Sequence, residues 1–192
     1  MNLPNCLTVL RLIMTPFFLA SLIYEFPQHY LIALIIFAAA SITDMFDGQI
    51  ARKRNLITDF GKFLDPLADK MLTTSAFLGF VFLKIGLGTV WIAFIVLIRE
   101  FLITSLRLVS AGKGTVIAAN VWGKAKTVSQ MFAIIVTILG RYILSFSSAN
   151  VLAVQVTVSV VTNSTLWISA ALTVISGVIY VAENKKYINP EK

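Results

Sequence analysis

Five of the nine acidic residues of this chain fall between Asp44 and Asp69, and long apolar runs flank them on both sides. Asp44 and Asp47 are three residues apart, and Asp65 and Asp69 are four apart, so each pair shares one face of a helix. Carboxylates beside apolar runs are costly, which calls for a chemical reason. Oxygen ligands without His or Cys are typical of Mg²⁺, Mn²⁺ or Ca²⁺. The pattern predicts a metal site, and a pair of ions there would suit phosphoryl chemistry.

Three other interpretations fit the acidic residues. They could form interface ion pairs with Arg52, Lys62 and Lys70, serve a cation or proton transporter, or belong to a membrane scaffold without catalytic activity. Two carboxylate pairs that face each other across a short loop favour the metal site over the ion pairs. Gly48 would let a ligand approach the backbone, and Arg52, one helical turn later, is placed for a phosphate. These two positions favour phosphoryl chemistry over transport.

The composition is that of an integral membrane protein. Of the 192 residues, 58% are hydrophobic and 13% are charged, and the mean hydropathy is +0.87, whereas soluble domains are about half apolar and a quarter charged. The apolar runs are continuous, which predicts helices and not a barrel. The net charge of +7 comes mostly from basic residues beside the apolar runs, so we expect no nucleic acid as a partner. We expect one domain over residues 1–192, because the loops are too short for another.

We predict an all-α membrane protein with six transmembrane helices, preceded by a short interfacial helix at the N-terminus. The interfacial helix falls within residues 2–10 and runs into the first span, and the spans cover roughly 9–25, 30–52, 61–83, 89–110, 123–145 and 163–183. Residues 146–162 are rich in Ser, Thr and Val, and we expect an extracytoplasmic loop or an interfacial segment there. Six spans put both termini on one side of the membrane. The excess of Lys and Arg on that side predicts that the termini and the aspartates face the cytoplasm.

A second group of charged residues lies in the fourth and fifth predicted spans. Arg99 is well inside its span, where a charge needs a partner. Glu100 could serve, but adjacent residues on a helix point apart, so we expect a further partner. Arg107 follows eight residues later, near the same stripe of the helix. Lys124 and Lys126 are either ordinary membrane anchors or, with the arginines, a basic pocket for the phosphate of an anionic acceptor.

The segment from Asp44 to Asp69 resembles the signature of the CDP-alcohol phosphotransferase family, D-x-x-D-G-x-x-A-R followed by G-x-x-x-D-x-x-x-D. The matching positions are Asp44, Asp47, Gly48, Ala51, Arg52, Gly61, Asp65 and Asp69, without departure. The resemblance implies transfer of a phosphatidyl group from a CDP-lipid to an alcohol, with release of CMP. It implies that the four aspartates hold two Mg²⁺ ions, with Mn²⁺ as an alternative. It further implies that Asp69 is the general base and that Gly48, Arg52 and Thr58 contact the CDP moiety.

Other stretches extend this resemblance over most of the chain. The N-terminal P-N-x-L-T-x-x-R is similar to family members, and we expect its Asn5 and Thr8 to help bind the cytidine end. Residues 64–70, 99–107, 123–130 and 172–180 look like the phosphatidylglycerophosphate synthase branch. This similarity implies CDP-diacylglycerol as donor, sn-glycerol 3-phosphate as acceptor, and a homodimer among the lipids of a bacterial plasma membrane. Cardiolipin synthase, or another acceptor within the family, is the alternative.

Overall fold

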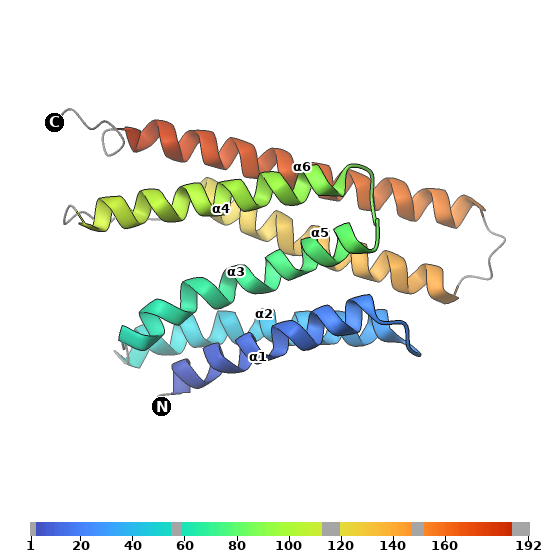
Figure 1. Ribbon diagram of the computed structural model, residues 1–192, viewed down its shortest axis with the longest axis horizontal. Coiled ribbons are helices and arrows are strands. Elements are labelled where there is room, and N and C mark those ends of the chain that lie inside the picture. The colour runs from blue at the N-terminus through green and yellow to red at the C-terminus, as the bar shows by residue number, and fades with distance from the viewer. Residues whose placement is uncertain (1–2, 55–58, 113–119, 147–151, 186–192) are drawn as a thin grey trace.

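The computed structural model describes residues 3–54, 59–112, 120–146 and 152–185, and these residues form six helices (Figure 1). The helices are α1 (Leu3–Ile23), α2 (His29–Arg54), α3 (Asp59–Phe82), α4 (Thr89–Gly112), α5 (Val121–Phe146) and α6 (Leu152–Glu183). For residues 3–4, 44–54, 59–66, 69 and 111–112 only the backbone is described. No strand occurs in the described ranges, so the all-α prediction is confirmed.

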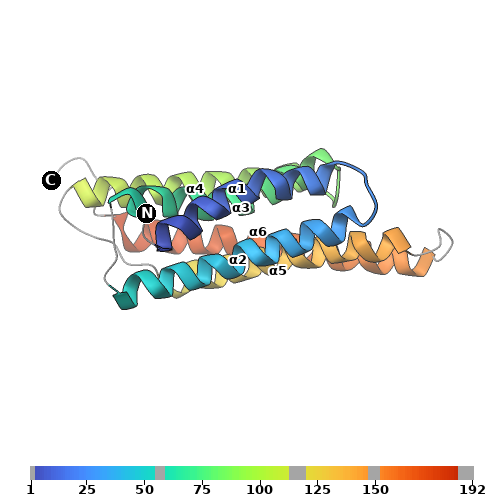
Figure 2. The ribbon, with the colours of Figure 1, turned by 90° about the horizontal axis from the view of Figure 1, so that it is seen from below.

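The helices lie along the long axis of the molecule and alternate in direction (Figures 1 and 2). α1 packs against both α2 and α3, which contact each other little, and α5 packs along α6. α4 lies against α3 and α6. The beginnings of α1, α3 and α5 and the ends of α2, α4 and α6 therefore meet at one end of the bundle, which we call the terminal end.

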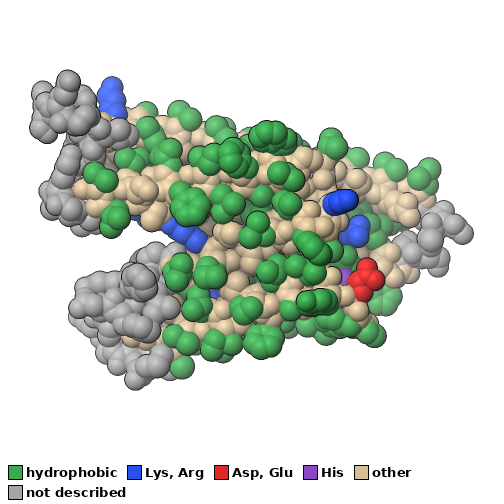
Figure 3. Space-filling view, viewed as in Figure 1, with side chains coloured by type: hydrophobic (Ala, Val, Ile, Leu, Met, Phe, Trp, Pro, Cys, Tyr) green, Lys and Arg blue, Asp and Glu red, His purple; other side chains and the backbone are tan. Residues whose placement is uncertain are grey.

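The outer surface is apolar, as a lipid environment requires. Figure 3 shows hydrophobic side chains spread over one face of the molecule with few charged ones among them, and Phe17, Phe101 and Leu108 are mostly exposed. Within the described ranges, three helices are long and apolar enough to cross a membrane, namely α5, α6 and α1 from Asn5 onward. α2 and α3 contribute shorter apolar stretches. The chain is a multi-pass membrane protein.

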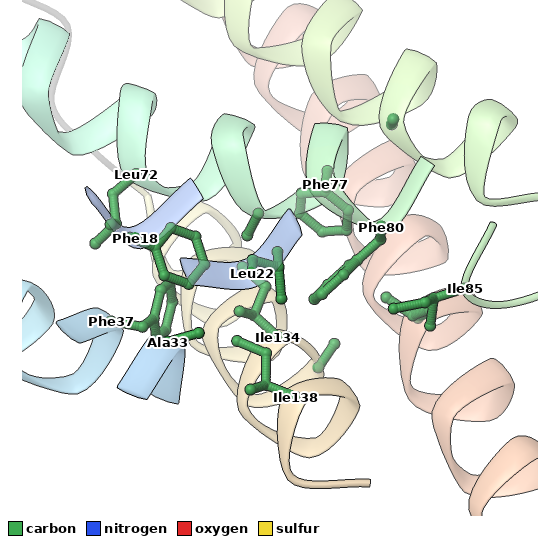
Figure 4. Packing of buried hydrophobic residues seen from close by; sticks show 14 of the residues in the cluster. Phe18, Leu22, Ala33, Phe37, Leu72, Phe77, Phe80, Ile85, Ile134 and Ile138 are labelled. Atoms are coloured by element: carbon green, nitrogen blue, oxygen red, sulfur yellow. The ribbon is translucent and has the colours of Figure 1, made fainter. Parts of the chain in front are cut away.

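A hydrophobic core fixes the position of α1 between its two neighbours. Phe18 of α1 packs against Phe37 of α2, with ring centroids 5.4 Å apart, and Leu22 lies with Phe77 of α3 and Ile134 of α5 in the same buried cluster (Figure 4). Close-packed interiors of this kind transmit geometry from one element to the next. The packing of α1 thus sets the separation of α2 and α3, the two helices that carry the aspartates.

Two glycines shape the turn between α3 and α4. Gly86 and Gly88 adopt φ angles of 84° and 70°, which glycine reaches without steric cost. α6 holds this turn, since Asn163 Oδ1 accepts a hydrogen bond from the Leu87 backbone N–H at 2.5 Å and Trp167 Nε1 donates to the Leu87 carbonyl at 3.0 Å. The turn is therefore anchored at the end of the bundle opposite the terminal end.

The predicted N-terminal helix is continuous with the first span, because α1 runs from Leu3 to Ile23 without a break. Pro4 lies in the first turn, where a backbone N–H would have no partner within the helix, so it does not interrupt the hydrogen bonding that follows. No residue between Pro4 and the first span provides a stop signal for the helix.

The loop expected over residues 146–162 is wrong for residue 146, which ends α5, and for 152–162, which are helical, while 147–151 lie outside the described residues. The alternative of an interfacial segment stays a prediction. α6 extends over 32 residues, from Leu152 to Glu183. Hydroxyl side chains there bond within the helix; Thr157 Oγ1, for example, donates to the Ala153 carbonyl at 2.8 Å. A composition rich in Ser, Thr and Val therefore remains compatible with a helix that packs against a neighbour.

Gly140 marks a close approach between α5 and α6. A Cβ atom at this position would lie 2.8 Å from Cγ1 of Val158 and 3.4 Å from Oγ1 of Thr162. Small residues at helix interfaces let two backbones come together in a membrane. The glycine therefore accounts for the packing of the first turns of α6, including part of the segment that was expected to be a loop.

Replacing Gly140 with Leu should lower the free energy of unfolding by about 1 to 3 kcal/mol, because the larger side chain forces α5 and α6 apart. Ala171→Leu is the control, since it introduces the same side chain at an exposed position of α6. Thermal unfolding in detergent measures both variants. Equal melting temperatures for the two would show that α5 and α6 do not depend on this contact.

Candidate functional site

The motif aspartates lie on two helices that come together at the terminal end. α2 carries Asp44 and Asp47 in its C-terminal part, and α3 carries Asp65 and Asp69 in its N-terminal part. The two helices run antiparallel, and the short 55–58 connection separates them in sequence. The backbone therefore brings both aspartate segments to one end of the bundle, as the helix pattern predicts.

The side chains of the motif lie outside the part of the chain that the structure describes. This applies to Asp44, Asp47, Gly48, Arg52, Asp65 and Asp69, and for Thr58 it applies to the whole residue. Among the described side chains, no group of three or more His, Cys, Asp or Glu could hold a metal ion. The predicted donors are all carboxylates, a set that fits a hard divalent cation. The metal ligands and all of the CDP contacts stay predictions.

Two of the predicted CDP-binding residues are described, and both lie at the beginning of α1. Asn5 and Thr8 are buried and one helical turn apart. Arg11, a further turn along, is also buried, and it reaches the cavity described next. The prediction that Asn5 and Thr8 bind the cytidine end is compatible with their place at the terminal end, and it stays a prediction.

A cavity of about 580 Å³ lies between the middle of the bundle and the terminal end, and residues of α1 to α5 line it. Its charged lining residues within the described ranges are Arg11, Lys70, Arg99, Glu100, Arg107, Lys124 and Lys126. Figure 3 shows basic side chains in the hollow between the upper and lower helices at this end. Ser41, three residues before Asp44, and Lys70, directly after Asp69, also line the cavity. The basic cavity thus borders both aspartate segments.

Glu100 of α4 connects three of these basic side chains. Its Oε1 atom forms an ion pair with Nζ of Lys126 and lies 3.3 Å from Nη1 of Arg99. Its Oε2 atom lies 3.9 Å from Nζ of Lys70. Lys126 is only 5% exposed, and a buried ammonium group needs such a partner. One carboxylate therefore joins α4 to α3 and α5.

Arg99 has the further partner that its place in the membrane predicts. Its Nη2 atom donates to Oγ of Ser176 on α6 at 2.9 Å, in addition to the contact with Glu100. Gly177, the next residue of α6, leaves room for the arginine stem, because a Cβ atom there would lie 3.3 Å from Arg99 Cγ. α6 thus holds Arg99 in place independently of Glu100.

Arg107 and Lys124 differ from the other two predicted phosphate-binding residues. Nε of Arg107 donates to the hydroxyl of Tyr180 at 3.0 Å, and the guanidinium carbon lies 5.5 Å from the centroid of that ring. Within the described chain, the terminal nitrogens of Arg107 and the ammonium group of Lys124 have no hydrogen-bond or ion-pair partner. The four residues therefore form two pairs: Arg99 and Lys126 share the charge of Glu100, while Arg107 and Lys124 present donors to the cavity.

Asn120 fixes the start of the helix that carries both lysines. α5 begins at Val121, and Oδ1 of Asn120 accepts a hydrogen bond from the Gly123 backbone N–H at 2.9 Å, as an N-cap does. Nδ2 of the same side chain donates to Oε2 of Glu183 at the end of α6, 3.2 Å away. The rule that Asn often precedes a helix could have identified this residue from the sequence.

The roles of Lys70, Ser176 and Tyr180 could not be predicted in this way. Each acts through a partner on another helix, far away in sequence, and no local pattern indicates such a pairing. The cavity as a whole holds six basic side chains and one acidic side chain among its described lining residues. Such an excess of positive charge around a cavity favours binding of an anion, and arginine favours a phosphate.

Known proteins resemble this chain over most of its length. It matches the family profile described as CDP-alcohol phosphatidyltransferase over residues 1–175. It is 37% identical to a CDP-diacylglycerol–glycerol-3-phosphate 3-phosphatidyltransferase of Bacillus subtilis, over 95% of each chain. A protein of the same name from Rickettsia bellii is 36% identical over 97% of each chain. A probable phosphatidylglycerophosphate synthase of Mycobacterium tuberculosis is 42% identical, over 94% of this chain and 80% of that protein.

Replacing Asn120 with Ala should lower the free energy of unfolding by about 1 kcal/mol, because the first turn of α5 loses its cap. Asn120→Ser is the matched control, since a serine hydroxyl can accept the same backbone hydrogen bond and should retain most of the stability. Thermal unfolding in detergent distinguishes the two variants. If alanine and serine gave the same melting temperature, the capping role of Asn120 would be wrong.

Proposed function

The chain belongs to the CDP-alcohol phosphatidyltransferase family, and we propose that it transfers the phosphatidyl group of CDP-diacylglycerol to sn-glycerol 3-phosphate. The products are phosphatidylglycerophosphate and CMP, so the reaction belongs to phospholipid biosynthesis. The relatives named above, which carry this activity in their names, support the choice of donor and acceptor. The observation that carries the proposal is the basic cavity, because it lies beside both aspartate segments and suits an acceptor that bears a phosphate.

The acceptor phosphate binds first to the side chains that have donors to offer. The terminal nitrogens of Arg107 can hold two phosphate oxygens at once, and the ammonium group of Lys124 supplies a point charge beside them. Tyr180 orients the guanidinium group through its hydroxyl and its ring. Held in this way, glycerol 3-phosphate can direct its free hydroxyl toward the aspartate segments that border the cavity.

The aspartate segments bind the donor and remove the proton. Asp44, Asp47, Asp65 and Asp69 would hold two Mg²⁺ ions, or Mn²⁺ in their place, which when bound neutralise the diphosphate and stabilise the departing CMP. Asp69 accepts the proton of the acceptor hydroxyl as that oxygen forms its bond to the phosphatidyl phosphorus. The bond from this phosphorus to the oxygen of CMP breaks in the same transfer.

The remaining motif positions bind the nucleotide part of the donor. Gly48 permits a close approach to the backbone of α2, Arg52 pairs with a phosphate, and Thr58 contributes a hydroxyl. Asn5 and Thr8 at the beginning of α1 contact the cytidine end. In this assignment, residues of α4 and α5 bind the soluble acceptor, and residues of α1, α2 and the start of α3 bind the CDP-lipid.

The proposal places the terminal end in the cytoplasm of a bacterial cell. α2 ends there in Arg52, Lys53 and Arg54, whereas Lys84 and Arg141 lie toward the opposite end. An excess of basic residues marks the cytoplasmic side of a membrane protein. CDP and glycerol 3-phosphate are also found on that side. The proposal further includes a homodimer, as the resemblance to the family implies.

The purified protein in detergent should release CMP from CDP-diacylglycerol when glycerol 3-phosphate is present. Glycerol and serine should give little or no release, because they lack a phosphate for the basic cavity, and phosphatidylglycerol should give little because its phosphate is a diester. Turnover with inositol phosphate and none with glycerol 3-phosphate would indicate another acceptor within the family. Removal of divalent ions by a chelator should stop the reaction, and added Mg²⁺ should restore it. Turnover with phosphatidylglycerol alone would indicate a cardiolipin synthase. Cation uptake into liposomes without any use of CDP-diacylglycerol would indicate a transporter.

Lys124→Gln should raise the KM for glycerol 3-phosphate about tenfold, because a charged hydrogen bond to the phosphate is lost. The kcat should change less, since Lys124 does not contact the reacting oxygen. Lys84→Gln is the control, as it removes the same charge at the opposite end of the bundle. A KM equal to that of the Lys84→Gln variant would exclude Lys124 from the acceptor site.

A further inference from the structure

We propose that Glu100 is a resident counter-ion of the basic cavity and that the phosphate of the acceptor displaces its carboxylate from Lys126. The identity of the acceptor rests on the proposed function. The exchange of one anion for another does not, because any phosphate that enters the cavity meets the same cations. Glu100 would then be a specificity-determining residue, since only an anion that competes with a carboxylate gains access to Lys126.

The first argument is the dependence of Lys126 on an anion. Its side chain is 6% exposed, and Glu100 is the one partner that the described residues supply to its ammonium group. A buried cation without a counter-ion is strongly unfavourable. In the absence of substrate Glu100 meets this need, and a bound phosphate can meet it equally well.

The second argument is the position of the carboxylate. Glu100 is not sealed behind the cavity but lines it, together with Arg107 and Lys124. A phosphate bound to those two residues shares the cavity with the carboxylate, and the like charges repel. The phosphate carries more charge and more acceptor oxygens than a carboxylate, so it is the stronger partner for Lys126.

The third argument is that the neighbouring groups are prepared for the exchange. Arg99 keeps its place when Glu100 leaves, because Ser176 accepts a hydrogen bond from its Nη2 atom at 2.9 Å. Lys70 offers the displaced carboxylate another cation, with Nζ already 3.9 Å from Oε2. A small movement of the Glu100 carboxylate, away from Lys126 on α5 and toward Lys70 on α3, would leave Lys126 paired with the phosphate and the carboxylate paired with Lys70.

This arrangement gives the cavity a preference for dianionic phosphates. A neutral alcohol or a zwitterion cannot replace Glu100 at Lys126, and a monoanion replaces it less well. The ion pair between Glu100 and Lys126 lowers the apparent affinity for a phosphate monoester, because the monoester reaches Lys126 only in those molecules in which the carboxylate has left it. All ligands lose affinity through this competition, but a dianionic phosphate loses least, so the cavity selects it.

The test is the Glu100→Gln variant, which keeps the size of the side chain and removes its charge. Binding of inorganic phosphate, measured by calorimetry in detergent, should become about fivefold tighter because the competing anion is gone. The KM for glycerol 3-phosphate should fall by a similar factor, and phosphate should raise the melting temperature of the variant more than that of the wild type. Glu183→Gln is the control, since it removes the same charge from a residue outside the cavity that bonds to Asn120.

Unchanged or weaker phosphate binding in Glu100→Gln would overturn the proposal and make Glu100 a permanent bridge between helices. If the glutamine variant does not fold, Glu100→Asp replaces it, and its shorter side chain should shift phosphate binding in the same direction by a smaller factor. No shift with aspartate would also count against the proposal. Tighter phosphate binding without any use of glycerol 3-phosphate would support the role of Glu100 while contradicting the proposed function.

Discussion

The charge on Glu100 holds together the polar part of a bundle that is otherwise apolar. A buried ion is stable only with a partner, and this one carboxylate contacts Lys126 of α5, Arg99 of α4 and Lys70 of α3. The cavity exists because these side chains line an open space and are not part of a close-packed core. The positions of the basic groups that line the cavity, and the access of an anion to them, depend on this arrangement of charges.

Packing at a distance from the cavity supports the same arrangement. α1 lies between α2 and α3, so Phe18 and Leu22 determine how far apart the two aspartate-bearing helices stand. α6 lies on the other side and supplies Ser176 and Tyr180, one turn apart, to Arg99 and Arg107. Neither α1 nor α6 carries the aspartate signature. Both helices are required to hold the aspartate segments and the basic cavity in fixed positions relative to each other.

Much of the fold could be predicted, because long apolar runs and Gly-rich turns determine helix boundaries locally. The predicted spans over 61–83 and 89–110, for example, match α3 and α4 within two residues at each end. The helix over 152–162 could not be predicted, since its composition is not typical of a helix and its packing against Gly140 of α5 is not visible in the local sequence. Four of the six basic residues that line the cavity were predicted from their types and places in the helices, namely Arg99, Arg107, Lys124 and Lys126. The division of these four residues into two that contact Glu100 and two that do not was not predicted, because it depends on an ion pair between α4 and α5.

In the proposed reaction, the cavity brings together two substrates of opposite character. One is a lipid whose CDP end would bind at the aspartates, and the other is a soluble phosphate ester that would bind at the basic side chains. The most direct test is an experimental structure with CDP-diacylglycerol and glycerol 3-phosphate bound to an inactive Asp69→Asn variant. We predict the phosphate of glycerol 3-phosphate in contact with Arg107, Lys124 and Lys126. A phosphate bound elsewhere, with the ion pair between Glu100 and Lys126 intact, would contradict this account.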